Sequence, residues 1–374
     1  MSKKKKILFF HFSLQGGGAE RVLVNLLKFL DRDKYDISLK TIFGVGPYVK
    51  AIPDDVKFSS VFKREFRGFS KIMSFLPGWF WHRLFIHDRY DIEVAYLENS
   101  PTRIIAASPD KHAKKVAWVH TEVTDKGLVV LGFKNENEMI KAHNRLNHLV
   151  FVSRRARDCF ASIFPNIDNP QLHVIHNVND FDKIHELAEV DPPININKDK
   201  LNLFLLGRLI HVKGVNRLID AFSRLRDDGC VNDVNVYVLG DGEERDALRV
   251  QIDKEGLSDT IHLLGFDPNP YRYLAKMDLF VCTSYREGYS TATTEAIALG
   301  IPVFTTDCSG MDEILDNGKY GMIVPNDDEA IYEGLKELLT HREKIDQYAA
   351  AIKAAPPMTT QALVNKYEEF FDSL

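Results

Sequence analysis

The sequence predicts an α/β protein with two doubly wound parallel sheets, and three observations support this fold class. The chain has 374 residues, and since domains of about 150 residues are typical, two domains are expected. Short apolar runs alternate with helix-like stretches, which is the pattern of parallel β-α-β units. This alternation stops at a polar, proline-containing segment, residues 186–200, and then restarts.

The first half begins with a β-loop-α-β unit. Residues 7–12 form an apolar run between lysines and Gly16-Gly17-Gly18, which indicates a buried strand entering a tight turn. Apolar residues then recur at helical spacing from Val22 to Leu30. Further strands are expected at 35–43, 92–96, 115–119 and 148–152. We therefore predict a first Rossmann-like domain over residues 1–190.

The second half repeats this organisation over residues 191–360. Strands are expected at 201–206, 234–239, 261–264, 279–282 and 302–305. Helices are expected at 215–226, 243–255, 271–276 and 293–299, and from 329 onward. Two Rossmann-like halves normally bind their ligand between the domains, at the carboxyl ends of the strands.

Composition and charge narrow the class of protein. Hydrophobic residues make up 45% and charged residues 27%, so the chain is expected to fold around sizeable cores. Residues 1–185 carry 29 Lys and Arg against 20 Asp and Glu, a net charge of +9, whereas residues 186–374 carry 19 against 33, or −14. This asymmetry suggests that the first half faces an anionic partner. Nucleic acid is not expected, because no binding motif is present and the second half is acidic.

Cysteine usage and the N-terminus point to the cytoplasm. The four cysteines lie far apart and form no CxxC pair, which is typical of a reduced cytosolic protein. A lysine run at residues 3–6 leads into only about seven apolar-rich residues, too few to span a membrane, and no cleavage pattern follows. We expect a cytoplasmic protein, peripheral on the inner face of the cell membrane.

Two loops have the residues of a phosphate site. Gly16-Gly17-Gly18 lies between a strand and a helix, where glycines allow close approach of a ligand and the helix N-terminus favours an anion. A tight turn without a ligand is the alternative. Arg208 and Lys213 follow the first strand of the second domain, where they could clamp a diphosphate and stabilise it as a leaving group. Solvated loop charges are the alternative there.

A third loop, residues 286–296, follows a very apolar strand and contains two carboxylates. We expect a helix that begins near Thr293, with Glu295 in its first turn accepting hydrogen bonds from ribose hydroxyls. Backbone amides before that helix would face phosphate oxygens, and Glu287 would point towards an attached sugar. In the alternative interpretation, Glu287 is exposed and Glu295 merely caps the helix.

With these motifs in place, the second half resembles the family 4 glycosyltransferases, which are retaining, nucleotide-sugar-dependent enzymes of the GT-B fold. The resemblance over residues 200–325 rests on Gly207-Arg208…Lys213-Gly214, Gly240-Asp241-Gly242 and Glu287-Gly288-(x6)-Glu295-Ala296. The first half is similar more weakly, through Gly16-Gly17-Gly18-Ala19-Glu20, Trp118-Val119-His120 and His176-Asn177. In detail the sequence is most similar to bacterial enzymes that build lipopolysaccharide, capsule or exopolysaccharide.

The resemblance implies a fold and a site. The two domains would face each other across a cleft, with the acceptor on the first and the donor on the second, and a C-terminal helix, residues 361–374, would return to the first domain. His120 would project into the cleft beside the reacting sugar. The implied catalytic residues are His120 and Glu287. The implied donor-binding residues are Gly17, Gly18, Arg208, Lys213, Gly288, Tyr289, Ser290, Thr291 and Glu295.

No metal or cofactor is expected, since the nucleotide sugar is a co-substrate. The Asp-x-Asp matches at 31–33 and 180–182 do not follow strands, as a metal-binding motif of the other large glycosyltransferase fold would. Arg208 and Lys213 can neutralise a diphosphate without magnesium.

Residues 62–89 mix basic and aromatic side chains. Six Lys and Arg stand against two Asp and Glu, among several Phe and Trp. Such a stretch can lie in an anionic lipid interface, although its charges and Pro77-Gly78 exclude a membrane span. In the alternative interpretation, the aromatic residues pack in the core of the first domain and the charges are solvated.

The predicted function is that of a retaining glycosyltransferase. It would move a hexose or N-acetylhexosamine from a UDP-linked donor to a hydroxyl of a growing, lipid-linked surface glycan. Two alternatives come from other classes: a nucleotide-sugar epimerase or hydrolase of the same fold, and a non-catalytic nucleotide-sugar-binding protein in which Glu287 and His120 would be dispensable.

Overall fold

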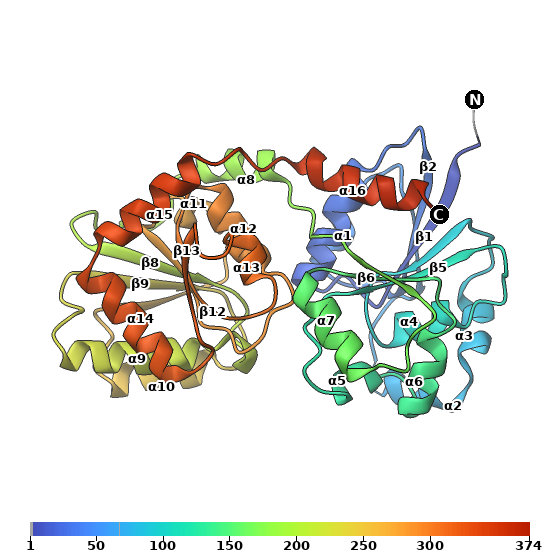
Figure 1. Ribbon diagram of the computed structural model, residues 1–374, viewed down its shortest axis with the longest axis horizontal. Helices are drawn as coiled ribbons and strands as arrows, with labels where there is room; N and C mark the ends of the chain where they lie inside the picture. Colours follow the sequence, from blue (N-terminus) through green and yellow to red (C-terminus); the bar gives the residue numbers. More distant parts are fainter. Residues whose placement is uncertain (1–2, 67) are drawn as a thin grey trace. The chain divides into compact units, whose positions relative to one another are not determined.

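The chain forms two compact units, drawn in Figure 1 from a computed structural model that describes residues 3–66 and 68–374. The first unit contains residues 1–179 together with the C-terminal segment 360–374, and the second contains residues 180–359. Each unit has a parallel sheet with helices packed on it. The predicted α/β class with two doubly wound domains is confirmed.

Within the described residues, the first unit has a sheet of seven parallel strands in the order β3-β2-β1-β4-β5-β6-β7. The strands are β1 Lys5–His11, β2 Tyr35–Phe43, β3 Lys57–Phe62, β4 Ile92–Ala95, β5 Lys114–Val119, β6 His148–Phe151 and β7 Gln171–Val174. The direction of strand addition reverses between β1 and β4. Such a switch point, at the carboxyl ends of the strands, is where open parallel sheets bind ligands.

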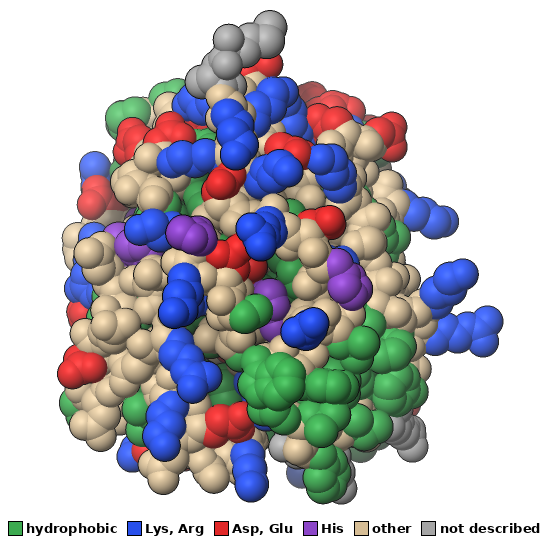
Figure 2. Space-filling view, turned by 90° about the vertical axis from the view of Figure 1, so that its right-hand side faces the viewer, with side chains coloured by type: hydrophobic (Ala, Val, Ile, Leu, Met, Phe, Trp, Pro, Cys, Tyr) green, Lys and Arg blue, Asp and Glu red, His purple; other side chains and the backbone are tan. Residues whose placement is uncertain are grey.

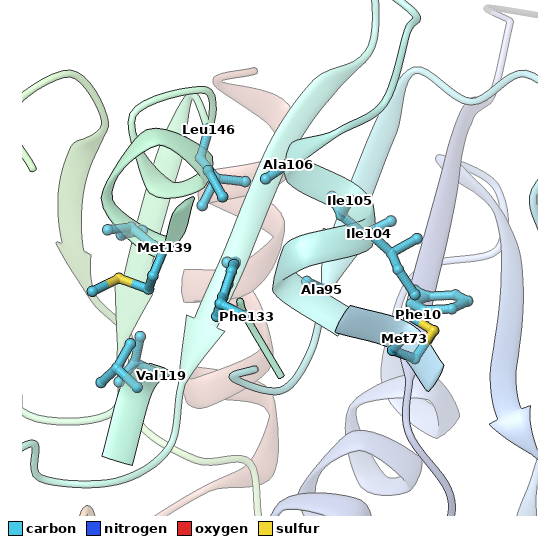
Figure 3. Packing of buried hydrophobic residues seen from close by; sticks show 14 of the residues in the cluster. Phe10, Met73, Ala95, Ile104, Ile105, Ala106, Val119, Phe133, Met139 and Leu146 are labelled. Carbon is cyan, nitrogen blue, oxygen red and sulfur yellow. The ribbon is translucent and has the colours of Figure 1, made fainter. Parts of the chain in front are cut away.

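Helices pack on both faces of this sheet. They are α1 Gly18–Phe29, α2 Phe69–Phe75, α3 Gly78–Phe85, α4 Ser100–Ala106, α5 Gly127–Val130, α6 Glu136–His143, α7 Arg154–Ile163 and α16 Thr360–Asp372, with a 3₁₀ turn at Pro47–Ala51. Successive strand side chains point to opposite faces. Accordingly, Phe10 joins Met73 and Ile104 in the core under α2–α7 (Figure 3), whereas Phe9 meets Phe371 of α16 on the other face.

The segment 62–89 divides between core and surface. Phe69 and Met73 of α2, and Trp81 and Phe85 of α3, are buried in the core, so the prediction that these side chains enter a lipid interface is wrong. Arg67, and the side chains of Ser70 and Lys71, lie outside the described part of the chain. Among the described residues, no helix has the length and apolar character needed to cross a membrane.

In the second unit, the described residues form a sheet of six parallel strands in the order β10-β9-β8-β11-β12-β13. The strands are β8 Leu201–Leu206, β9 Val234–Leu239, β10 Ile261–Gly265, β11 Leu279–Cys282, β12 Val303–Thr306 and β13 Gly321–Val324. The switch point lies between β8 and β11, which are the two strands that precede the predicted donor loops.

Both faces of this second sheet are also covered. The helices are α8 Phe181–Ala188, α9 Val215–Asp227, α10 Arg245–Lys254, α11 Tyr271–Leu274, α12 Thr291–Ala298, α13 Met311–Ile314, α14 Asp328–Thr340 and α15 Glu343–Lys353, with a 3₁₀ turn at His211–Lys213. Leu203 and Leu205 pack in one core, with α9 and α14. Phe204 points to the opposite face and packs in the other core, with α11, α12 and α13.

The boundary between the units lies earlier than predicted. We expected it after residue 190, but the division falls between Asn179 and Asp180, so that α8 belongs to the second unit. The reason is packing: α8 contacts α11 and α12, and the side chain of Asn269 donates a hydrogen bond to the Leu187 carbonyl over 2.9 Å. Asp180 caps α8 by accepting from the Lys183 amide, which gives the Asp-x-Asp match at 180–182 a structural role.

The C-terminal helix α16 packs in the first unit, and it begins at Thr360. The Tyr367 ring stacks on Trp118, with centroids 5.4 Å apart. Just after the C-terminal end of α1, the Asp31 amide donates a hydrogen bond to the Glu368 side chain of α16. The same carboxylate pairs with Lys34 over 3.0 Å. These apolar and polar contacts together hold α16 on the first sheet.

Candidate active site

Two of the predicted donor loops meet beyond the carboxyl ends of β8 and β11. The Tyr285 amide donates to the Val212 carbonyl over 2.9 Å, and the Thr283 hydroxyl donates to the Gly214 carbonyl over 2.8 Å. These bonds join the loop that follows β8 to the loop that follows β11. The second unit therefore brings Arg208, Lys213 and Glu287 to one edge of its sheet, at the switch point.

Two glycines allow this close packing of loops. Gly214 has a φ of +62°, and a Cβ there would lie 2.1 Å from the Thr283 carbonyl oxygen. Gly240, in the loop after β9, would place a Cβ 1.8 Å from the Gly207 carbonyl oxygen. Both separations are too short for any other residue. The glycines of these motifs therefore fix the course of the loop that carries Arg208 and Lys213.

Lys213 and Glu287 form an ion pair in which Nζ lies 2.7 Å from Oε1. The Ser284 hydroxyl donates to the same carboxylate oxygen over 2.7 Å. Burial alone would lower the pKa of Lys213, but the Glu287 carboxylate outweighs this effect and raises that pKa above its ordinary value. The ammonium is therefore charged at neutral pH. A bound diphosphate would compete with Glu287 for it, whereas Arg208 is exposed in the same loop.

The residues Gly288 to Thr291 lead into α12. Ser290 caps this helix by accepting from the Thr293 amide over 3.2 Å, and Thr291 is the first helical residue. The N-terminus of a helix attracts anions through its amides and its dipole. Gly288 is buried and Tyr289 is half-buried in the same turn. The four residues thus lie where a phosphate group would meet the end of α12.

Glu295 lies deeper than predicted. We expected it in the first turn of a helix beginning near Thr293, but the cap at Ser290 starts α12 two residues earlier and moves Glu295 into the second turn. Its side chain is 1% exposed, and the Tyr271 hydroxyl donates to Oε1 over 3.3 Å. A ligand that uses this carboxylate must therefore share it with Tyr271.

In the first unit, the glycine loop lies at the switch point between β1 and β4. Gly17 is the residue before α1, and Gly18 is its first residue. A Cβ on Gly17 would approach the Glu20 carboxylate to 2.3 Å. Because that carboxylate ends a flexible side chain that can move aside, the contact does not itself require glycine, but the missing side chain leaves the amides at the start of α1 open to close approach by a ligand.

His120 follows β5 at the same edge of the first sheet. Its ring lies against Tyr96, with centroids 4.8 Å apart, and Nε2 is buried with no hydrogen-bond partner among the described residues. Burial, together with the nearby His11, lowers the pKa of His120 to about 3. The imidazole is therefore neutral at physiological pH and can exchange hydrogen bonds with a hydroxyl, but it does not act as a cation.

Two residues beside His120 were missing from the sequence prediction. Glu98 accepts from the His120 amide and, over 3.0 Å, from the Thr121 amide, so it fixes the backbone of this loop. Its burial raises its pKa. His11 ends β1, is buried, and has Nδ1 2.7 Å from the Ser13 carbonyl oxygen. His11 at the end of one apolar strand and Glu98 shortly after another occupy positions that could have identified them.

Each half of the predicted site thus lies within its own unit. The second unit brings together Arg208, Lys213, Glu287, the turn into α12 and Glu295, and the first brings Gly17 and Gly18 to the same sheet edge as His120. Among the described residues, no group of three or more His, Cys, Asp or Glu side chains is arranged to hold a metal ion. The roles of these residues in binding and catalysis remain predictions.

Two parallel-sheet units of this kind make up the GT-B fold. The fold is similar to the crystal structure of Anabaena HepE in complex with UDP, with a TM-score of 0.76 and 20% identity over 99% of this chain and 100% of that one. It is also similar to WaaG, a glycosyltransferase involved in lipopolysaccharide biosynthesis, with a TM-score of 0.69, 16% identity and coverage of 97% and 99%.

Sequence comparison adds a family match within the second unit. Residues 188–355 match the family model of the glycosyl transferases group 1, so the chain carries a group 1 glycosyltransferase domain. A Campylobacter jejuni N-acetylgalactosaminyltransferase is 28% identical over 90% of both chains. A putative colanic acid biosynthesis glycosyltransferase of Salmonella typhimurium is 34% identical over 37% of this chain and 36% of its own length. The chain is therefore similar to a known glycosyltransferase over 90% of its length.

Proposed function

We propose that this protein is a retaining, metal-independent transferase that moves a hexose or N-acetylhexosamine from a UDP-sugar to a hydroxyl of a growing, lipid-linked surface glycan. The observation that carries the proposal is the meeting of the Lys213–Glu287 pair with the loop into α12 at the switch point of the second unit. A cation, a carboxylate and a helix N-terminus at one sheet edge suit a sugar diphosphate.

The names of similar proteins support the finer parts of the proposal. The Campylobacter jejuni relative is named for transfer of N-acetylgalactosamine to a sugar on diphospho-undecaprenol. The structure of Anabaena HepE was solved in complex with UDP. Together they favour a UDP-sugar donor and an acceptor carried on a lipid diphosphate.

In the proposed reaction, the donor diphosphate takes Lys213 from Glu287 and gains Arg208 as a second cation. The bond between the anomeric carbon and the phosphate oxygen breaks while the bond to the acceptor oxygen forms. The acceptor proton passes to the departing diphosphate, on the same face of the sugar, so the configuration is retained. Arg208 and Lys213 neutralise the charge that develops on the leaving group, which removes the need for a metal ion.

The remaining residues position the sugar and the nucleoside. Glu287, released from Lys213, accepts hydrogen bonds from hydroxyls of the transferred sugar. Glu295 accepts from the ribose hydroxyls, and the neutral His120 exchanges a hydrogen bond with the sugar near the reacting carbon. Glu98 keeps His120 in place through the backbone. Hydrogen bonds from neutral hydroxyls to a carboxylate are among the stronger ones in proteins.

The proposal places the protein in the cytoplasm, at the inner face of the cell membrane where a lipid-linked acceptor would be met. Among the described residues, none of the four cysteines forms a disulfide, which suits a reducing compartment.

The donor is tested by measuring thermal stabilisation of the protein with a panel of UDP-, GDP- and ADP-sugars. A ligand at 100 times its Kd should add about 2.7 kcal/mol to the free energy of unfolding. We expect a rise in Tm with UDP-sugars and little change with the others. A rise confined to GDP- or ADP-sugars would contradict the proposed donor, and no rise with any sugar nucleotide would contradict the proposed function.

A further inference from the structure

His11 has a buried ring nitrogen that the proposed reaction does not use. His11 is the last residue of β1, and its side chain is 0% exposed. Its Nδ1 lies 2.7 Å from the Ser13 carbonyl oxygen, and because a carbonyl oxygen can only accept, Nδ1 carries the proton and donates it. Nε2 of the neutral ring is then an acceptor, and among the described residues it has no hydrogen-bond partner. Figure 2 shows other histidine side chains at the surface, where water reaches the ring; His11 is closed off from it.

His120 repeats this arrangement. Its ring makes a hydrogen bond to the Tyr96 backbone that favours the protonated form, as a carbonyl acceptor does. The other nitrogen, Nε2, is buried and has no partner within the described chain. Burial lowers the pKa of both histidines, so both rings are neutral at physiological pH. Each ring therefore has one nitrogen fixed as a donor to the backbone and one acceptor nitrogen left unpaired.

The two rings lie at the switch point of the first sheet. Strand β4 pairs with β1 on one side and with β5 on the other. His11 ends β1 and His120 follows β5, while Tyr96 follows β4 between them, with its amide bonded to the Phe10 carbonyl over 3.0 Å. His11 is close enough to lower the pKa of His120, and Glu20 of α1 is close enough to oppose the lowering of the pKa of His11. A ligand bound among these acceptors must bring the hydrogen-bond donors.

Two unpaired acceptors at this place indicate a ligand. A buried acceptor without a partner destabilises the folded protein, and native structures keep few such groups without a water molecule, an ion or a functional role. The switch point of an open parallel sheet is also where ligands bind. Since the proposed reaction already gives His120 a hydroxyl of the sugar, the neighbouring nitrogen of His11 has a ligand of the same kind within its surroundings.

We propose that Nε2 of His11 accepts a hydrogen bond from a hydroxyl of the transferred sugar, beside the hydroxyl bound by His120, and that the two rings together select a neutral sugar. A sugar carboxylate would meet two lone pairs and the Glu20 carboxylate, which repel it. A sugar that lacks the hydroxyl would leave Nε2 buried and unpaired, which a site built for hydrogen bonding rejects strongly. The preferred donors are therefore UDP-hexoses and UDP-N-acetylhexosamines rather than UDP-hexuronates.

This proposal rests on the proposed function, and the test separates the sugar from the nucleotide. Isothermal titration calorimetry of the full chain measures Kd for UDP, for the UDP derivatives of glucose, galactose, N-acetylglucosamine and N-acetylgalactosamine, and for UDP-glucuronate and UDP-galacturonate. We expect one of the four neutral sugar nucleotides to bind about tenfold or more tightly than either uronate. A uronate that binds as tightly as the best neutral donor would contradict the selection.

Two replacements of His11 distinguish its two ring nitrogens. Asparagine can keep a donor at the place of Nδ1 but has no atom at the place of Nε2, whereas glutamine can bring a carbonyl oxygen near Nε2 but loses the bond to Ser13. His11→Asn should weaken binding of the preferred UDP-sugar by about tenfold and lower kcat/KM at least as much, with Kd for UDP unchanged. His11→Gln should recover part of both losses despite a lower Tm. A purely structural role predicts the reverse order.

Monodeoxy analogues of the preferred UDP-sugar identify the hydroxyl. In the wild type, the analogue that lacks the hydroxyl bound by His11 should bind about tenfold more weakly than the parent. In His11→Asn the same analogue should bind no more weakly than the parent, because the partner of that hydroxyl is already gone. Penalties that add for every analogue would contradict a direct contact.

His143→Asn is the matched control. His143 is buried in the same unit, and its Nδ1 lies 2.9 Å from the Met139 carbonyl oxygen, but it belongs to α6 rather than to the carboxyl edge of the sheet. This variant should bind UDP and the UDP-sugars like the wild type. If His11→Asn also binds them like the wild type, Nε2 meets no more than a buried water and the proposal is wrong. Wild-type protein that does not bind UDP contradicts the proposed donor, and this inference with it.

Discussion

Replacing Glu295 with alanine should lower the rate of sugar transfer by about a hundredfold or more, which corresponds to roughly 3 kcal/mol of lost transition-state stabilisation. The physical reason is that its carboxylate lies in the second turn of α12. There it would bind the ribose and so align the diphosphate with the helix N-terminus. The measurement is kcat/KM for transfer from a UDP-sugar. Glu295→Gln should be similarly impaired, because an amide presents only one oxygen to two hydroxyls.

Two controls separate this role from a structural one. Tyr271→Phe removes the neighbouring hydrogen bond to the carboxylate but leaves the carboxylate itself, so it should have a much smaller effect on transfer. Glu329→Gln changes an exposed ion pair of the same unit and should leave transfer unchanged. If Glu295→Ala folds normally and transfers sugar at the wild-type rate, Glu295 does not bind the donor.

Replacing Lys213 with alanine should also reduce transfer by about a hundredfold or more. Lys213 is a charged ammonium paired with Glu287, and in the proposed reaction the diphosphate takes the place of that carboxylate. Without this lysine, the diphosphate would lose one of its two cations and would meet the Glu287 carboxylate unscreened. Both donor binding and departure of the leaving group would be penalised. Single-turnover kinetics should show both a weaker Kd for the UDP-sugar and a slower chemical step.

The matched control for this variant is Lys319→Ala, which removes an exposed lysine that pairs with Asp316 over 3.4 Å in the same unit. It should transfer sugar like the wild type. The double variant Lys213→Ala/Glu287→Ala also removes the repelling carboxylate, so it should recover part of the lost affinity for UDP. Unchanged donor affinity in Lys213→Ala would contradict the assignment of this lysine to the diphosphate.

The central strands could be predicted from the sequence. β2, β8, β9 and β11 occur at the predicted residues, because strands covered on both faces need nearly continuous apolar runs. β3, β7 and β13 were not predicted. All three lie at the edges of their sheets and are partly exposed, so their alternation of apolar and polar residues is incomplete.

The sequence predicts which loops form the site, but it does not predict which of their side chains are in contact. Lys213 and Glu287 are 74 residues apart in sequence, and they meet only because β8 and β11 are neighbours across the switch point, which the sequence pattern does not specify. The start of α12 was misplaced because the hydroxyl of Ser290 caps the helix, whereas Thr293 and Thr294 have equally suitable side chains. Helix α8 fell within the predicted first domain because the polar segment 186–200 marked the expected boundary, whereas the two units divide before α8.

The most direct test of the central claim is to measure UDP release from a UDP-sugar with and without a polyprenyl-diphosphate-linked glycan acceptor, and to determine the anomeric configuration of the product. The account predicts UDP release that depends on the acceptor, an equal amount of glycosylated acceptor, and retention of configuration. Conversion of the UDP-sugar to another nucleotide sugar, or UDP release that is independent of any acceptor, would contradict it.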